Sequence, residues 1–412
     1  MDLTENRAST GSPYSLIVIV AALGYFVDLY DLVLFGVVRD ASLIGVGVID
    51  KLERIRIGEN MLSIQMIGML IGGILWGVLG DKMGRLKVLF GSIIMYSVAN
   101  IANGLVENVQ QYEICRFIAG VGLAGELGAG ITLIAESTRK EQRGVGTMVV
   151  VVFGALGAVT SALTGSLTTW RTSYFIGGVL GLGLLALRVG VSESSLFKDL
   201  ESKRGVSKGN FFTLFSSARN LRKYFSGILI GLPIWFTIST FIIGGPEFAE
   251  KLMVQGEVTR AKCILYAYLG LSLGDIISGT LCQILKSRKQ TLYIFLATTI
   301  LSCVLYLTAN GVTVSYFYLV CFLIGALTGY WAIFVMLASE QFGTNLRATV
   351  TTSSPNFVRA AVYPIAAAFQ WLRVDMGYIG AATLIGGICI GLAILATTFS
   401  KETFHKDLNY LE

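Results

Sequence analysis

GVLGDKMGRLK, residues 77–87, ends one apolar run of the chain and leads into the next. The run before it covers about residues 60–80, and a turn of glycines and charges then interrupts the hydrophobicity abruptly. Gly77 would let a neighbouring helix approach closely, because it has no side chain. Asp81 could face the N-terminus of another helix, whose dipole favours an anion. The stretch therefore predicts that an apolar helix ends here at a membrane surface, with a basic turn outside the lipid.

The composition of the whole chain also indicates a membrane protein. Of its 412 residues, 54% are hydrophobic and only 14% are charged, whereas a soluble domain averages about 25% charged residues. Apolar runs of about 20 residues, which is the length that spans a bilayer, recur along the sequence. The sequence thus predicts an all-α integral membrane protein with twelve transmembrane helices, at about 14–38, 60–80, 87–106, 111–135, 144–167, 172–190, 224–245, 262–283, 291–309, 315–338, 349–372 and 377–399.

The distribution of basic residues indicates how these helices are oriented. If the N-terminus is cytoplasmic, most of the 32 lysines and arginines fall in cytoplasmic loops, as the positive-inside rule requires. The same bias accounts for the net charge of +6 without nucleic acid as a partner. The polar N-terminus, MDLTENRASTGSP, lacks the cationic region of a cleavable signal peptide. We therefore expect a multi-pass protein of the cell membrane with both termini in the cytoplasm.

The two halves of the chain repeat each other weakly. GTLCQILKSRK at 279–289 corresponds to 77–87, and ASEQFGTNLRA at 338–348 corresponds to AESTRKEQRG at 135–144. We expect six-helix bundles at 1–196 and 224–400, a cytoplasmic linker at 197–223 and a cytoplasmic tail at 401–412. Part of the linker could form an amphipathic helix on the membrane surface or be a solvated connection. Two similar bundles are typical of a secondary transporter that rocks around a central substrate site.

The stretch 77–87 resembles the loop 2–3 signature of the major facilitator superfamily, G-x-x-x-D-[RK]-x-G-[RK]-x-[RK]. The stretch lies after the second of twelve expected helices, and the resemblance in architecture covers the whole chain. It implies two pseudo-symmetric six-helix bundles, the major facilitator fold. The positions that fit the signature are Gly77, Asp81, Lys82, Gly84, Arg85 and Lys87.

This resemblance also implies a latch that clamps the two halves together in the outward-open state. Arg143 is a candidate ion partner for Asp81. The second-half copy has Gln283 where the acid would be, so we expect the latch to be weaker or absent on that side. The residues expected to take part in gating are Gly77, Asp81, Arg85, Glu136, Arg143, Glu340 and, directly after Leu346, Arg347.

Three further stretches resemble one group of branches in the superfamily, the metabolite:proton, aromatic-acid:proton and phosphate:proton symporters. They are RFIAGVGLAGELGAGITLIAESTRKEQRG at 116–144, GYFVDLYDLVLFG at 24–36 and LRVGVSESSLF at 187–197. Two features depart from that pattern. Ala124-Gly125 replaces the glycine pair before the acid, and Leu127-Gly128 replaces the Tyr-Pro that follows it in phosphate carriers.

Six charged residues lie well inside the expected spans, away from the span ends: Asp28, Asp31, Glu126, Asp275, Arg116 and Arg359. A charge at the bilayer centre costs about 2.5–3.5 kcal/mol on insertion scales. Asp28 and Asp31 are three residues apart and so share one helix face. Such residues must therefore line a wet cavity or pair with one another, and they mark ion and substrate pathways. The alternative interpretation is a set of buried ion pairs that only fix the helix register.

The charges suggest how a transporter would work. A carboxylate that gains and loses a proton could couple transport to protons; Glu126 and Asp31 are the first choices, and Asp28 and Asp275 are further candidates. Arginine binds carboxylate or phosphate through two parallel hydrogen bonds, so Arg359, followed by Arg116, is expected to anchor an anion. Tyr330 would be the second-half counterpart of Glu126, because TGYWAIF takes the place of AGELGAG. Polar and aromatic candidates for the substrate pocket are Tyr30, Trp235, Tyr330 and Asn356.

We therefore expect proton-coupled symport of a small organic anion (a carboxylate) or phosphate by alternating access. Alternatives are a proton antiporter that exports amphipathic cations or drugs, a sugar or polyol transporter, and a nutrient sensor. The expected partners are a small-molecule substrate, protons and membrane lipid, and we expect a monomer.

An enzyme is not expected, because the sequence has no Walker loop, Ser/His pair or metal-ligand spacing. The only histidine is His405, in the polar tail, and the six cysteines form no C-x-x-C pair. No cofactor or metal is therefore expected.

Overall fold

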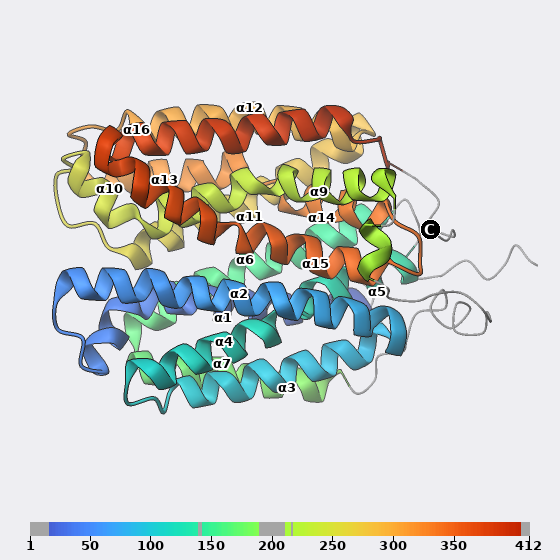
Figure 1. The fold of residues 1–412 in the computed structure, drawn as a ribbon, viewed down its shortest axis with the longest axis horizontal. Coiled ribbons are helices and arrows are strands. Elements are labelled where there is room, and N and C mark those ends of the chain that lie inside the picture. Colours follow the sequence, from blue (N-terminus) through green and yellow to red (C-terminus); the bar gives the residue numbers. More distant parts are fainter. Residues whose placement is uncertain (1–15, 139–141, 189–210, 216, 405–412) are drawn as a thin grey trace, which may run out of the picture.

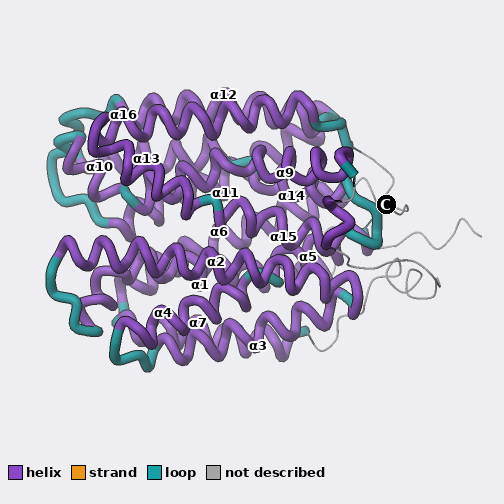
Figure 2. The backbone as a smooth tube through the Cα atoms, in the orientation of Figure 1, coloured by secondary structure: helices purple, strands orange, loops and turns teal. Residues whose placement is uncertain are grey.

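The structure, a computed structural model, describes residues 16–138, 142–188, 211–215 and 217–404. Within these ranges the chain is helical almost throughout, with loops collected at the two ends of the bundle (Figure 2). No β-strand forms in the described ranges, and an isolated bridge joins Gln255 to Thr313. The architecture is therefore all-α, as predicted.

The elements divide into two halves, which Figure 1 colours blue to green and yellow-green to red. The first half contains α1 (Leu16–Gly45), α2 (Lys51–Met83), α3 (Arg85–Asn103), α4 (Val109–Leu123), α5 (Glu126–Ser137), α6 (Arg143–Leu167) and α7 (Trp170–Leu187). The second half contains the 3₁₀ turn η1 (Phe211–Phe215), α9 (Ala218–Phe236), the π-helix η2 (Thr237–Ile243), α10 (Gly245–Lys251), α11 (Arg260–Leu285), α12 (Arg288–Leu307), α13 (Val314–Thr328), α14 (Trp331–Glu340), α15 (Arg347–Ala360) and α16 (Val362–Phe399).

The number of membrane crossings agrees with the sequence. Eleven stretches of the described chain are long and apolar enough to span a bilayer, and the last of them, Arg347–Phe399, has 53 residues. At 1.5 Å per residue it would measure about 80 Å, far more than a hydrocarbon core of about 30 Å. It turns back at Gly377, whose φ of 71° is readily adopted only by glycine, and Figure 1 shows its red part returning along the bundle. The stretch crosses twice, so the prediction of twelve crossings is confirmed.

Breaks within spans occur at matching places in the two halves. The fourth crossing is broken between α4 and α5, and the tenth between α13 and α14. α5 begins at Glu126 and α14 begins at Trp331, so Tyr330 lies one position before the strict counterpart of Glu126. The seventh crossing changes from α9 to the π-helix η2 four residues after Pro233. Because interrupted helices leave backbone groups unpaired inside the membrane, such sites need polar partners from elsewhere.

The two halves meet along two pairs of helices. α2 packs against α15, and α6 packs against α11. Glycines allow the first contact: a Cβ at Gly77 would lie 2.9 Å from the Cα of Thr349. Gly128 similarly faces the backbone of Thr352. The close approach expected at Gly77 is therefore present, and it brings the charged groups of the two halves within reach of one another.

Several helix boundaries differ from the apolar runs. α2 begins at Lys51 rather than about 60, because a helix can continue past the lipid into the charged sequence KLERIRIGEN. Of the stretch 210–225, which could form a surface helix or a solvated connection, the structure describes 211–215 and 217–225. Phe211–Phe215 make a single 3₁₀ turn, and α9 starts at Ala218 instead of 224, so residues 218–223 extend a spanning helix. Residues 189–210, which include most of the LRVGVSESSLF stretch, and the tail from His405 lie outside the described residues.

We expect Gly157→Ala to lower the unfolding temperature, because a Cβ there would overlap the carbonyl oxygen of Phe26 on α1. Overpacking of this kind typically costs about 1–3 kcal/mol. Gly183→Ala on α7 is the matched control, since a Cβ there meets no atom within 4 Å. Thermal unfolding of the purified protein in detergent compares the two variants. Equal unfolding temperatures would contradict the close packing of α1 on α6.

Candidate functional site

One face of α1 carries three positions in a row that face buried arginines. Gly24, Asp28 and Asp31 are four and three residues apart, so they lie on the same side of the helix. Both carboxylates are fully buried. At 1.5 Å per residue the row is about 10 Å long. Each position faces a different arginine, and the three surroundings are described in turn.

Arg359, on α15 of the second half, lies opposite Asp28 at the boundary between the halves. Its guanidinium is 3.9 Å from the carboxylate of Asp28 and 3.2 Å from the hydroxyl of Tyr25, both on α1. It also donates to the side chain of Asn356 at 3.2 Å. Asn356 in turn donates to the carbonyl of Ala124, in the break between α4 and α5. A single cation thus joins α1, α15 and the broken fourth crossing.

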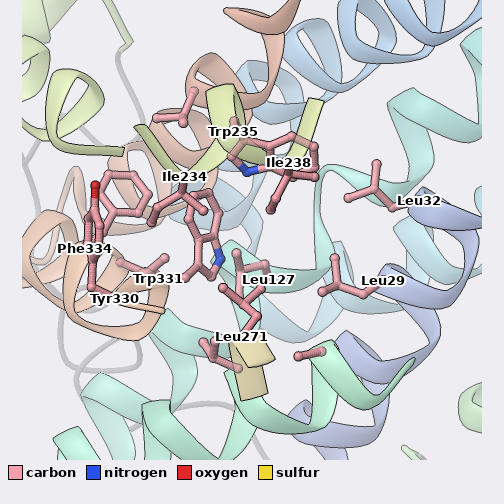
Figure 3. Close-up of a cluster of buried hydrophobic side chains, with 14 of the residues drawn as sticks. Leu29, Leu32, Leu127, Ile234, Trp235, Ile238, Leu271, Tyr330, Trp331 and Phe334 are labelled. Atoms are coloured by element: carbon pink, nitrogen blue, oxygen red, sulfur yellow. The ribbon is translucent and has the colours of Figure 1, made fainter. Parts of the chain in front are cut away.

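Two tryptophans of the second half lie beside this cation. The guanidinium carbon of Arg359 is 5.7 Å from the ring centres of both Trp235 and Trp331, within the range of cation–π attraction. Trp331 also donates to the Tyr25 hydroxyl at 3.0 Å. Figure 3 shows the two indoles next to each other, with Leu29 of α1 across from them. A small cavity adjoins this group, lined in part by Tyr25, Leu29, Trp235, Ile238, Tyr268 and Trp331.

Glu126 has its own partner, Arg188, at the end of α7. The guanidinium contacts both carboxylate oxygens of Glu126, one of them at 3.1 Å, and both side chains are buried. The pair packs against Gly24, where a Cβ would overlap it. Sequence reasoning missed Arg188 because it closes the apolar run 172–190, where it resembled a loop cation. The signal in the sequence that could have found it is Gly24. A glycine on the face of α1 that carries the acids does not face lipid, and it leaves room for a buried acid with its cation.

Asp31 and Arg116 lie inside the first half. Arg116 interacts electrostatically with Asp31 and lies over the ring of Tyr174, 5.2 Å from its centre. It also donates to the side chains of Gln65 and Asn100, each at 3.4 Å. These groups come from α1, α2, α3, α4 and α7, all in the same bundle. Neither carboxylate oxygen of Asp31 accepts a hydrogen bond from the described chain, so the two residues belong to a buried polar cluster within the first half rather than to a closed ion pair.

Asp275 on α11 binds the broken tenth crossing. Its carboxylate accepts a hydrogen bond from the backbone N–H of Ala332 at 3.1 Å, in the first turn of α14. A helix N-terminus favours an anion, because its first N–H groups lack partners within the helix. Asp275 therefore stabilises the half-helix that presents Trp331 to the centre.

The two predicted tyrosines do not reach the central group. Tyr30 donates to the carbonyl of Ser173 at 2.9 Å within the first half. Tyr330 donates to the carbonyl of Ile230 at 2.9 Å within the second half, and in Figure 3 its hydroxyl points away from the indoles. The structure thus brings together Asp28, Arg359, Asn356 and Trp235 of the predicted site. Asp31 lies near Arg116, apart from this group. Glu126, Asp275, Tyr30 and Tyr330 each have separate contacts nearby.

One end of the bundle is closed by a second charged group, which we call the latch: Asp81, Arg85, Glu136 and Arg347. Asp81 caps the N-terminus of α15. It accepts hydrogen bonds from the backbone N–H groups of Ala348 at 3.1 Å and Thr349 at 2.8 Å, and from the Thr349 hydroxyl at 2.7 Å. The expectation that Asp81 faces a helix N-terminus thus agrees with the geometry, and that helix belongs to the other half.

The rest of the latch is a buried network of ions. Glu136 binds Arg85 of its own half at 2.8 Å and Arg347 of the other half at 3.1 Å, and all three side chains are fully buried. Arg85 also lies 3.4 Å from Asp81, so the described ion partner of Asp81 is Arg85 rather than Arg143. Gly84 provides the turn between α2 and α3 with a φ of 103°, which explains the glycine at this position of the signature.

The second half carries a counterpart of this latch in which the uncharged Gln283 takes the place of Asp81. Arg288, the first residue of α12, binds Glu340 at 2.9 Å, just as Arg85, the first residue of α3, binds Glu136. Glu340 therefore pairs within its own half. Gln283 approaches Gly144, next to Arg143 in the first turn of α6, which is the place equivalent to Asp81 at α15. Because an amide carries no charge, the ionic cap is absent there.

Comparison with known proteins was made on the whole chain. Residues 14–367 match the family model described as Major Facilitator Superfamily. The benzoate transport protein of Acinetobacter baylyi is 25% identical over 323 residues, which cover 70% of this chain and 68% of that protein. The 3-(3-hydroxy-phenyl)propionate transporter of Escherichia coli is 24% identical over 364 residues, covering 85% and 86%.

A solved structure is similar in fold. The proton:xylose symporter XylE, bound to 6-bromo-6-deoxy-D-glucose, superimposes with a TM-score of 0.74 at 15% identity, covering 95% of this chain and 97% of that one. At this identity the likeness concerns the fold alone. Together with the family match, it confirms the predicted resemblance in architecture.

We expect Asp81→Asn to weaken closure of the latch end. The substitution removes the negative charge from the N-terminus of α15, an effect of about 1–2 kcal/mol. Distances between spin labels at the exposed residues Lys82 and Lys401 report the separation of the halves at this end. A second, longer distance population should appear in the variant. Gln283→Leu is the matched control, and an equal response of the two variants would contradict the ionic asymmetry.

Proposed function

Because the chain belongs to the major facilitator superfamily, whose members are transporters and not enzymes, we propose that it is a secondary transporter that takes up a small aromatic carboxylate together with a proton. The observation that carries the proposal is the position of Arg359. This buried cation contacts Asp28 and Tyr25 of one half and two indoles of the other. A ligand bound there would touch both halves at once, as alternating access requires.

The charge of Arg359 favours an anion as substrate. Arginine recognises a carboxylate with two parallel hydrogen bonds, and such charge-assisted bonds are stronger than neutral ones. The contact with Asp28 is long, at 3.9 Å, so a substrate carboxylate can replace it at closer range. Glu126 is already bound by Arg188 through both oxygens. That leaves no free acid there for a cationic drug, which makes export of amphipathic cations the weaker alternative.

The surroundings of Arg359 favour an aromatic acid over phosphate. Trp235, Trp331 and Tyr25 provide flat apolar walls, and the small adjoining cavity is lined mostly by apolar side chains. Aromatic rings pack well in such a site, whereas phosphate would leave several oxygens without donors. The names of two relatives, a benzoate transport protein and a hydroxyphenylpropionate transporter, support the same class. Benzoate is therefore the probe chosen below.

Asp28 is the proposed proton carrier. Neither of its carboxylate oxygens accepts a hydrogen bond from the described part of the chain. With Arg359 alone it forms a neutral pair. When a substrate carboxylate takes its place at Arg359, two anions face one cation in a buried site, and protonation of Asp28 restores neutrality. The proton then travels with the substrate, and its release on the other side lets Asp28 bind Arg359 again.

The latch end is proposed to face the cytoplasm, with both termini on that side. The basic turns at Lys82–Lys87 and Lys286–Lys289 lie at this end, as the positive-inside rule favours. With the latch closed, the bundles 1–196 and 224–400 would admit substrate from the outside and rock to release it inside. In that step Gly77, Asp81, Arg85 and Glu136 of the first half would separate from α15 and its Arg347. The pair Arg288–Glu340 lies within the second half and would move as a unit.

Arg359→Gln should abolish benzoate uptake into proteoliposomes with an imposed inward proton gradient. Losing a buried charge-assisted pair costs about 1.5–3 kcal/mol, or about 10- to 100-fold in affinity. Arg116→Gln, which alters a cation inside the first half, is the comparison. Arg359→Lys should retain part of the binding, because the charge remains. Uptake by Arg359→Gln at the wild-type rate would refute the assignment, and efflux of organic cations instead would favour the antiporter.

Asp28→Asn should separate exchange from accumulation. The neutral side chain mimics the protonated acid, so exchange of labelled for unlabelled benzoate should continue while proton-driven accumulation is lost. Glu126→Gln, which breaks the pair with Arg188, should impair both activities together. Accumulation by Asp28→Asn to the wild-type level would show that the proton is carried elsewhere, with Glu126 the next candidate.

A further inference from the structure

The end of the bundle opposite the latch contains a pocket between the halves, lined by residues of both. It lies at the end where Figure 1 shows α10 and the turn within α16. Charged side chains from both halves line it: Arg39 and Glu59 from the first, and Glu247, Arg260 and Arg373 from the second. Its lining holds three arginines and two glutamates, and Asp40 beside it lies 3.7 Å from Arg260. We call this space the mouth pocket.

Two ion pairs at this end join the two halves, one of them between Asp40 of α1 and Arg260 of α11. Arg39 of α1 binds Glu247 of α10 at 3.2 Å, and Arg260 of α11 binds the same carboxylate at 3.0 Å. Burial raises the pKa of the Glu247 carboxyl, but Arg260 and Arg39 more than offset it and hold the pKa below its ordinary value. Glu247 is therefore ionised at neutral pH. Glu247 would compete with any incoming anion for Arg39 and Arg260.

Donors remain available for such an anion. Arg39 is 95% buried, since only 5% of its surface is exposed, and its Nε has no hydrogen-bond partner in the described chain. Arg373 has no carboxylate within 4.0 Å among the described residues, and its guanidinium donates to the Tyr378 hydroxyl at 3.0 Å. The same guanidinium lies 5.3 Å from the centre of the Tyr378 ring.

An aromatic cluster completes the mouth pocket. The rings of Phe248, Phe369 and Tyr378 contact one another with centres 5.5–5.9 Å apart. Arginines beside an aromatic cluster repeat the chemistry found around Arg359, Trp235 and Trp331. The mouth pocket is therefore suited to the same ligand, a carboxylate on an aromatic ring.

The mouth pocket lies further along the bundle than the central site, toward the end opposite the latch. Val362, Ala366, Phe369 and Arg373 line it, and they continue the face of α15 and α16 that carries Arg359. Along that face Arg359 and Arg373 are fourteen residues, about 21 Å, apart. The π-helix η2 separates the two spaces, with Ile238 lining the central cavity and Thr240 lining the mouth pocket. π-Helical turns of this kind are frequent at functional sites.

We infer that the mouth pocket is a second, outer binding site for the small aromatic carboxylate, at which the ligand binds Arg373 and displaces Glu247 from Arg39. This inference rests on the proposed function for its ligand class. Displacement of Glu247 removes an ion pair that holds the halves together at this end. Arrival of the substrate therefore loosens the mouth before the substrate reaches Arg359.

Calorimetric titration of benzoate into the purified full-length protein tests this. The wild type should show two sites, and Arg359→Gln should keep only the weaker one. Arg373→Gln should weaken that site by about tenfold or more. Glu247→Gln should tighten it several-fold, because Arg39 is freed from its competitor; a merely structural role for Glu247 would not increase affinity. Arg171→Gln is the matched control, since Arg171 also lies over an aromatic ring, that of Trp170, outside the pocket.

The outcomes separate the two proposals. A single wild-type site that disappears in Arg359→Gln and is unchanged by Glu247→Gln overturns the outer site and leaves the proposed function standing. A single site that survives in Arg359→Gln, weakens in Arg373→Gln and tightens in Glu247→Gln supports the mouth pocket and overturns the central assignment. No benzoate binding by any folded variant overturns both. Unfolding temperatures of each variant confirm that the folded protein is being titrated.

Discussion

The buried guanidinium of Arg359 is the constraint on which the rest of the structure depends. A cation at this depth is costly unless it is paired, and its partners here come from both sides of the boundary between the halves: Asp28 and Tyr25 on α1, and Trp235 and Trp331 on α9 and α14. Neither half alone provides a complete environment for it. The environment of Arg359 therefore depends on the contact between the halves, and under the proposed function a substrate carboxylate would take the place of Asp28 when the halves move.

The broken helices serve this centre. Asn356 connects Arg359 to the carbonyl of Ala124, where α4 ends. Asp275 binds the first turn of α14, which orients Trp331. Each interruption leaves unpaired backbone groups within the membrane, and each is compensated by a polar side chain from another helix. The two interruptions occur at matching places in the two halves, so the repeat in the sequence produces a symmetric frame around an asymmetric set of charges.

The ends of the bundle are held by different chemistry. The latch combines a helix N-terminus, a carboxylate and two arginines in a fully buried network. Its second-half counterpart lacks the ionic cap because Gln283 is neutral. At the mouth the connecting pairs are Arg39 with Glu247, whose side chain is 23% exposed, and Arg260 with Asp40, whose side chain is 53% exposed. Buried ion pairs are much harder to separate than partly exposed ones. The difference explains why the structure is firmly closed at one end and hollowed at the other.

Much of this could be predicted from the sequence, because hydrophobic runs and basic turns report directly on the lipid environment. The number of crossings, the close approach at Gly77 and the cap formed by Asp81 all follow from local patterns. The grouping of the buried charges does not, since it depends on contacts between distant helices. Glu126 binds Arg188 and Asp31 lies near Arg116, all within the first half, whereas Asp28, which the sequence ranked behind Glu126 and Asp31, faces the other half.

Arg188 shows the limit most clearly. It ends an apolar run, where a long basic side chain usually extends toward the water, yet here it turns inward to Glu126. Only the packing of α1 at Gly24, which leaves room for the pair, indicates this direction. The helix boundaries at Lys51 and Ala218 were misjudged for a related reason: hydrophobicity marks the lipid, not the end of the helix.

The central claim is that a substrate carboxylate replaces Asp28 at Arg359 and that Asp28 then takes up a proton. The most direct measurement is the proton uptake that accompanies benzoate binding to the purified protein in weakly buffered detergent solution near neutral pH. The account predicts that about one proton leaves the solution for each benzoate bound at the central site, through linkage of the two equilibria. Binding of benzoate at that site without any change in the pH of the solution would contradict it.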